Sequence, residues 1–114
     1  MNSFVKAERA PVKTDFSKVH TSASAPQGPD PTNWDWFTQG VCTPVYNQGQ
    51  CGSCWAFSAT ETIESYFAIA GNSLTQLSME QIVDCDTTDQ GCNGGFPENA
   101  YQYVQGAGGI ETYA

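Results

Sequence analysis

The sequence has few basic side chains, and none at all beyond its eighteenth residue. All four Lys and Arg residues lie between Lys6 and Lys18, whereas ten carboxylates lie between Val19 and Ala114, and the net charge is −8. A nucleic acid needs cations against its phosphates, and an anionic membrane attracts basic segments. The composition therefore argues against both partners, and a solvated acidic surface that aids solubility is the simplest interpretation.

Long apolar runs and histidine are also scarce. No stretch approaches the length of a membrane-spanning helix, and Met1–Lys6 lacks the apolar core of a secretory signal. His20 is the only histidine. Cysteine, by contrast, is abundant: five in 114 residues, enough chain for one small domain, predict an oxidising compartment or a metal site. A cysteine-rich chain of this kind is expected to carry a secretory signal, so its absence suggests that Met1 is not the natural start of the precursor.

The composition changes near residue 31. Residues 1–31 are rich in Ser, Ala, Pro and charged side chains, which is typical of a linker. Aromatic and glycine residues become frequent in 32–114. We therefore expect the folded part to be 32–114.

The longest predicted helix covers residues 54–70. Ser53 is a good N-cap residue, and Gly71 is a stop signal. Apolar side chains recur at three- and four-residue spacing along it. These side chains are predicted to face the core: Ala56, Ala59, Ile63, Phe67 and Ala70.

Two shorter helices are predicted further along the chain. One begins at Ser78, where Gln81 fits a capping box, and ends near Asp84. The other runs from about Pro97 to Gln105, with proline in its first turn and glycines after it. The stretches between the helices are predicted to be loops: 41–53 and 85–96.

Cys54 is a candidate nucleophile because it falls in the first turn of the long predicted helix. Unpaired N–H groups and the positive end of the helix dipole favour a thiolate there. Gln48 lies six residues earlier in a glycine-bounded loop, so its side-chain amide could stabilise a developing oxyanion.

Two other interpretations of the cysteines stay open on the residues alone. Cys51 and Cys54 have the spacing of a thioredoxin-type redox pair, although the preceding residues 46–50 are too polar for the buried strand such a pair needs. Cys51, Cys54, Cys85 and Cys92 could bind zinc, but six residues separate the second pair where two to four are usual.

The sequence around Cys54 resembles the papain and cathepsin family of cysteine peptidases. Cys51-Gly52-Ser53-Cys54-Trp55 matches the signature of that family. Further matches occur in the family's order over about residues 33–114: Thr43-Pro44-Val45, Asn47-Gln48-Gly49, Ala56-Phe57-Ser58-Ala59, Leu77-Ser78, Val83-Asp84-Cys85-Asp86 and Gly91-Cys92-Asn93-Gly94-Gly95. The resemblance implies an α+β fold. This chain would form mostly its helical (left) domain, with one long central helix and loops, truncated before the β-rich domain.

The resemblance also implies roles for single residues. Cys54 corresponds to the catalytic cysteine, and Gln48 to the glutamine that forms the oxyanion hole with the Cys54 backbone N–H. Cys51 and Cys92 correspond to a disulfide pair, and Trp55 is expected mainly to fill the core. The positions expected to bind an extended peptide substrate are Gly52, Gly94, Gly95, Phe96 and Pro97.

Several positions depart from the family pattern. Met79 stands where the family has glutamate, which argues against a buried carboxylate pairing with Glu64. Cys42 is an extra cysteine, expected to be a buried free thiol, and Cys85 is expected to lack its partner. The acids of the 84–89 loop do not fit a calcium loop and are expected to be solvated.

The family places its histidine and asparagine about 130–150 residues beyond the cysteine, whereas 60 residues follow Cys54 here and His20 precedes it. We therefore expect a fragment that lacks the C-terminal half of its domain and is inactive alone, or an inactive papain-like module. Residues 1–31 then correspond at best to the end of a propeptide. The resemblance implies no metal or organic cofactor, peptide or protein substrates, cystatin-like inhibitors, and a lysosomal, vacuolar or secreted location.

Overall fold

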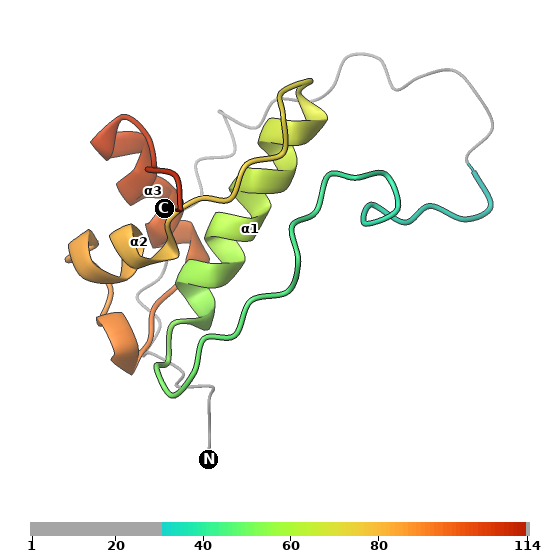
Figure 1. The fold of residues 1–114 in the computed structure, drawn as a ribbon. Helices are drawn as coiled ribbons and strands as arrows, with labels where there is room; N and C mark the ends of the chain where they lie inside the picture. The colour runs from blue at the N-terminus through green and yellow to red at the C-terminus, as the bar shows by residue number, and fades with distance from the viewer. Residues whose placement is uncertain (1–30, 114) are drawn as a thin grey trace.

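The computed structural model describes residues 31–113, which form a small helical unit. Its elements are α1 (Cys54–Ile69), α2 (Met79–Cys85), the 3-10 turn η2 (Gly91–Asn93) and α3 (Pro97–Ala107). Figure 1 shows α1 as the long central helix, with α2 and α3 packed on one side of it and the segment before α1 on the other. The only β-interaction found within 31–113 is an isolated antiparallel bridge between Leu77 and Thr112. The expected helical domain is thus confirmed. Of the predicted linker, 1–31, only residue 31 is described, and His20 lies outside the described residues.

The bounds of the helices match the sequence prediction closely. α1 ends one residue before the predicted position. α3 runs two residues further than predicted, because Gly108 adopts a left-handed conformation (φ 80°) that ends the helix only there. None of the helices within 31–113 has the length and apolar character needed to cross a membrane.

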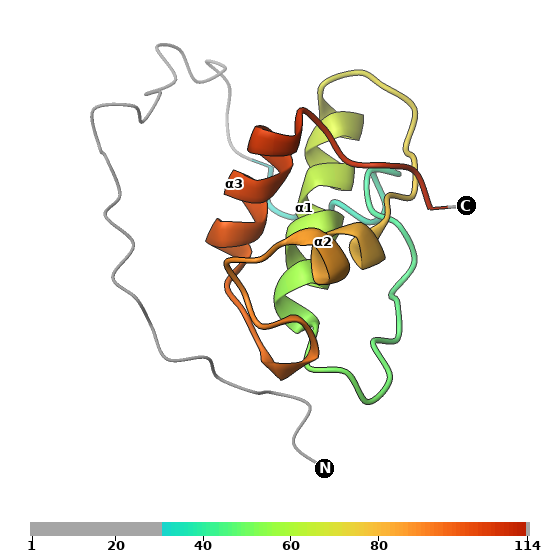
Figure 2. The ribbon, with the colours of Figure 1, turned by 90° about the vertical axis from the view of Figure 1, so that its left-hand side faces the viewer.

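The core lies between the first half of α1 and the two shorter helices. Trp55, Ala56 and Ala59 of α1 pack there against Ile82 of α2 and Ala100 of α3, and Ala56, Ala59, Ile82 and Ala100 are fully buried. Alanine at two successive turns of α1 lets α2 and α3 approach its backbone closely. The turned view in Figure 2 shows α2 and α3 lying across α1.

The second half of α1 does not follow the predicted pattern. Ile63 is half-buried, Phe67 is 47% exposed and Ala70 is also exposed. The prediction of a buried face is therefore wrong beyond the middle of the helix. The reason is that α2 and α3 cover only the first turns of α1, where their core residues Ile82 and Ala100 pack.

Two predicted helix caps form differently from expectation. The Ser53 side chain makes no capping hydrogen bond; its backbone carbonyl instead accepts from the N–H of Ala56 and of Phe57 at 2.9 and 3.1 Å. Ser78 does cap α2, since its hydroxyl accepts from the Gln81 N–H at 3.2 Å. The Gln81 side chain, however, bonds the Tyr103 hydroxyl (3.3 Å) and the Glu111 N–H (2.7 Å), so it joins three segments and does not complete a capping box.

Glu64 is a fully buried carboxylate with neutral hydrogen-bond donors. It accepts from the Thr43 hydroxyl at 2.6 Å and the Leu77 N–H at 2.7 Å, and the Tyr46 hydroxyl lies 3.5 Å away. Met79 is buried. As expected from Met79, Glu64 therefore has no carboxylate partner at position 79. Its hydrogen bonds instead bind the segment before α1 and the segment before α2 to the central helix.

Candidate active site

Cys54 is the first residue of α1, so its side chain stands at the N-terminal end of the central helix. It is a free cysteine and is half-buried. No acidic residue lies in the first turn of α1. The thiol therefore lies near the positive end of the helix dipole, without a carboxylate of its own helix turn to oppose a negative charge.

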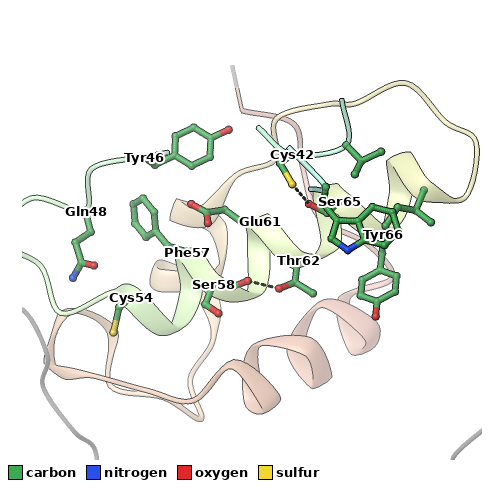
Figure 3. Close-up of a pocket in the computed structure, with 13 residues that line it drawn as sticks. Cys42, Tyr46, Gln48, Cys54, Phe57, Ser58, Glu61, Thr62, Ser65 and Tyr66 are labelled. Carbon is green, nitrogen blue, oxygen red and sulfur yellow. Dashed lines mark hydrogen bonds between the residues drawn. The ribbon is translucent and has the colours of Figure 1, made fainter. Parts of the chain in front are cut away.

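Gln48 lies in the loop before α1, near the same end of the helix. Figure 3 shows its amide and the Cys54 thiol beside the start of the helix. The amide nitrogen donates to the Cys51 carbonyl at 2.9 Å, which fixes the side chain against the loop that carries the cysteine. The structure thus brings together the two residues predicted as nucleophile and oxyanion donor.

The loop before α1 and the first turn of α1 are joined to the 91–95 loop by three interactions. Cys51 and Cys92 form a disulfide, as the family resemblance implied. Beside it, the buried Gly52 donates its N–H to the Cys92 carbonyl at 2.9 Å. The Trp55 indole donates to the Gly91 carbonyl at 3.1 Å, so this core aromatic also holds the second loop.

The pairing of Cys51 with Cys92 decides between the open interpretations of the cysteines. Cys51 is not paired with Cys54, so the redox pair is not formed, and the four-cysteine zinc site is excluded in this structure. No group of three potential metal ligands was found within residues 31–113. Cys42 and Cys85 are free, as expected, although Cys42 is half-buried rather than buried.

The predicted substrate segment follows the disulfide directly. Gly94 has a positive φ of 123°. A Cβ on Gly95 would lie 2.5 Å from the Trp55 ring and 2.8 Å from the Asp89 Cβ, so only glycine fits there. Phe96 has extended backbone angles (φ −127°, ψ 133°), and Pro97 begins α3.

Asp89 holds this segment, which the sequence did not suggest. Its Oδ1 accepts from the Phe96 N–H and from the Asn99 side chain, both at 3.0 Å. Asp86 is only 5% exposed, and Asp89 is half-buried. The expectation of solvated loop acids is therefore wrong for these two. The one sign in the sequence that Asp86 is not simply solvated is the pattern Asp86-Thr87-Thr88, which favours an Asx turn. In the structure the Asp86 carboxylate accepts from the Thr88 N–H in such a turn.

A groove extends from Cys54 along α1. Its volume is about 690 Å³. One wall is α1, with Phe57 and Tyr66, and the other is the preceding segment, with Tyr46 (Figure 3). Trp36 of that segment also lines the groove. Tyr66 is 70% exposed and Trp36 is 50% exposed. The groove is thus an open, largely apolar surface that leads to the thiol.

The electrostatics of the groove are entirely acidic or neutral. Residues 31–113 contain no Lys, Arg or His. Burial raises the pKa of Glu61 in the groove wall, and the negative charge of Glu64 raises it further. Burial also raises the pKa of Tyr46, against a hydrogen bond from Thr43 that lowers it. Residues 31–113 therefore supply no imidazole to Cys54.

The site thus combines a thiol at the start of a central helix, a glutamine amide beside it and a glycine segment held by a disulfide. The profile described as "Papain family cysteine protease" matches residues 30–114. The chain belongs to this family.

Similar proteins support the same assignment. "Cysteine proteinase 1" of Dictyostelium discoideum is 49% identical over 92 residues, covering 72% of this chain and 27% of that protein. "Digestive cysteine proteinase 2" of Homarus americanus is 41% identical over 116 residues, covering 100% of this chain and 34% of that protein. The crystal structure of the proform of the ragweed pollen allergen Amb a 11, a cysteine protease, matches with a TM-score of 0.67 and 46% identity, over 68% of this chain and 24% of the allergen chain. The chain therefore spans about a third or less of the length of these relatives.

Proposed function

We propose that Cys54 is the nucleophile of a peptide-bond hydrolase to which this chain contributes the helical half. Its position at the start of α1, next to Gln48, is the observation that carries the proposal. The thiolate attacks the scissile carbonyl, the C–N bond breaks, and the amine leaves after taking up a proton, which gives the acyl-enzyme. Water then hydrolyses the thioester, which releases the carboxylic acid and regenerates the cysteine.

Gln48 is proposed to stabilise the oxyanion of the tetrahedral intermediate together with the Cys54 backbone N–H. The hydrogen bond from its amide nitrogen to the Cys51 carbonyl holds the Gln48 amide beside the start of α1, where the oxyanion would form. Preorganised donors of this kind contribute about 2.7–4 kcal/mol each to transition-state stabilisation.

The segment Gly94–Pro97 is proposed to bind the extended peptide, with Gly52 beside it. Glycine at position 94 supports close approach of a substrate backbone, and glycine at position 95 lets the segment lie against Trp55. The disulfide and the Trp55–Gly91 hydrogen bond fix this segment relative to Cys54. The disulfide also supports the proposal that the protein works in an oxidising location: a lysosome, a vacuole or outside the cell. Cystatin-like inhibitors are proposed to enter the same cleft.

The apolar groove along α1 is proposed to receive the remaining half of the peptidase domain, which would supply the histidine. Exposed aromatic side chains on both walls support a protein occupant, since apolar patches of this kind mark interfaces. The alternative is an inactive papain-like module. The absence of any Lys, Arg or His between residues 31 and 113 favours inactivity of this chain by itself.

The test is an assay of purified, monomeric 1–114 on an unfolded protein substrate, beside a Cys54→Ala variant. Both proteins should be inactive. Adding the histidine-bearing half of a close papain-family relative should restore turnover with wild-type 1–114 but not with Cys54→Ala. Cysteine-dependent turnover by 1–114 without that half would contradict the need for an outside histidine. Restored turnover in Cys54→Ala would contradict the role of Cys54.

A further inference from the structure

Asp86, which is buried, and Asp89, which is half-buried, form a carboxyl pair beside the proposed substrate segment. One oxygen of each is used: Asp86 Oδ1 accepts from the Thr88 N–H at 2.9 Å, and Asp89 Oδ1 accepts from the Phe96 N–H and the Asn99 amide at 3.0 Å. The two Oδ2 atoms are buried, and neither has a hydrogen-bond partner among the described residues. Two orphaned carboxyl oxygens in one loop need a proton or a cation between them.

No cationic side chain is available to this pair within 31–113. The titratable groups on the neighbouring helices are Glu80, Asp84 and Cys85 of α2 and Glu98, Tyr101 and Tyr103 of α3. None of them is a cation, and all but the half-buried Tyr103 are exposed. In η2, Cys92 is held in the disulfide and does not titrate. The contribution of α1 to this corner is the Trp55 ring, which meets Gly95 beside the Asp89 Cβ. Two ionised carboxylates would therefore repel each other without compensation.

We propose that Asp86 and Asp89 share one proton, and that the protonated pair positions the Gly94–Phe96 segment to bind peptide, most firmly at acidic pH. The proton satisfies both Oδ2 atoms at once, because one oxygen carries it as a donor and the other accepts. Asp89 then acts as a positioning residue through the Phe96 N–H. The peptide-binding part rests on the function proposed above for this segment.

The energetics agree with the geometry. Burial raises the pKa of Asp89 from its ordinary 3.8; hydrogen bonds from Asn99 and Phe96 lower it, and the Asp86 carboxyl raises it again through a hydrogen bond and its charge. The pKa belongs to the pair as a whole. A carboxyl group whose pKa is higher in the folded state than in the unfolded state stabilises the folded state when it is protonated. This stabilisation is complete at pH values below the pKa of the unfolded state, and it is lost as the pH rises through the pKa of the folded state. Loss of the proton therefore loosens the loop.

Three asparagine variants separate the shared proton from a merely structural role. In Asp86→Asn an amide N–H replaces the shared proton and donates to Asp89 at every pH. Asp89→Asn does the same in the opposite direction, while its carbonyl still accepts from the Phe96 N–H. Asp84→Asn is the matched control, since it removes an exposed carboxylate two residues from the pair.

The experiment is an NMR titration of the full chain between about pH 3 and pH 8, which spans the carboxyl range. It follows the Phe96 amide and the side-chain carboxyl signals. In wild type and Asp84→Asn, the Asp89 carboxyl and the Phe96 amide should share one titration, displaced upward from the usual aspartate range. In Asp89→Asn the Phe96 amide should not titrate, and in Asp86→Asn it should titrate with Asp89 at a lower pH than in the wild type. A Phe96 titration that persists in Asp89→Asn would overturn the proposal, and so would one that is unshifted in Asp86→Asn. A shift of these signals on adding Ca²⁺ alone would show a cation in place of the proton and would equally overturn it.

A second measurement distinguishes this proposal from the proposed function. Affinity of the chain for an uncleavable extended peptide should fall as pH rises in the wild type and stay constant in Asp86→Asn. A peptide that binds at no pH would refute the substrate role of the segment, while the NMR titration would still decide whether the proton is shared.

Discussion

Replacing Gly95 by alanine should destabilise the protein, although the residue lies in a loop. The new Cβ would lie 2.5 and 2.7 Å from two atoms of the Trp55 ring and 2.8 Å from the Asp89 Cβ. The ring cannot easily move away, because it is 98% buried in the core and its indole N–H is bonded to Gly91. Overpacking of this kind typically costs about 1–3 kcal/mol. With two rigid neighbours in the way, we expect a loss of about 2–3 kcal/mol in the free energy of unfolding.

Gly106→Ala is the matched control, with the opposite expected sign. Gly106 is exposed in the last turn of α3, and a Cβ there would meet nothing within 4 Å. Alanine should stabilise the helix by about 0.5–1 kcal/mol. Urea unfolding of both variants, with equal slopes, gives the two differences directly. A Gly95→Ala protein as stable as the wild type would refute the contact with Trp55 and the steric need for glycine.

Three further predictions concern the cysteines and the helix cap. Replacing both Cys51 and Cys92 by serine should cost about 4 kcal/mol in the chain-entropy model for a separation of 41 residues, and urea unfolding that shows no loss would contradict it. Ser78→Ala should lower the free energy of unfolding by about 1 kcal/mol, because it removes the hydroxyl that accepts from the Gln81 N–H at the start of α2; an unchanged urea midpoint would show that this cap is dispensable. Peptide mapping without reductant should find Cys42 and Cys85 free; a bridge between them would refute the pairing described here.

The sequence predicted the parts of this fold that depend on local chemistry. Gly71, Ser78 and Pro97 set the helix ends because each acts on the backbone next to it. Resemblance to a known family located Cys54, Gln48 and the disulfide. These predictions required no knowledge of how the helices pack.

What the sequence did not predict depends on contacts between distant segments. The donors to the Glu64 carboxylate come from Thr43 and Leu77, 21 and 13 residues away. Burial of Asp86 and Asp89 follows from the way the loop after α2 folds against the start of α3. Exposure of Phe67 follows from where α2 and α3 meet α1, which helical periodicity alone does not determine.

The most direct test of the central claim is the rate of peptide hydrolysis by the protein from the complete reading frame, with Cys54 replaced by alanine. If Cys54 is the nucleophile, kcat should fall by at least about 1,000-fold. Gly106→Ala, an exposed change in the last turn of α3, should leave the rate unchanged. Retention of wild-type hydrolysis by Cys54→Ala would contradict the assignment of Cys54 as the nucleophile.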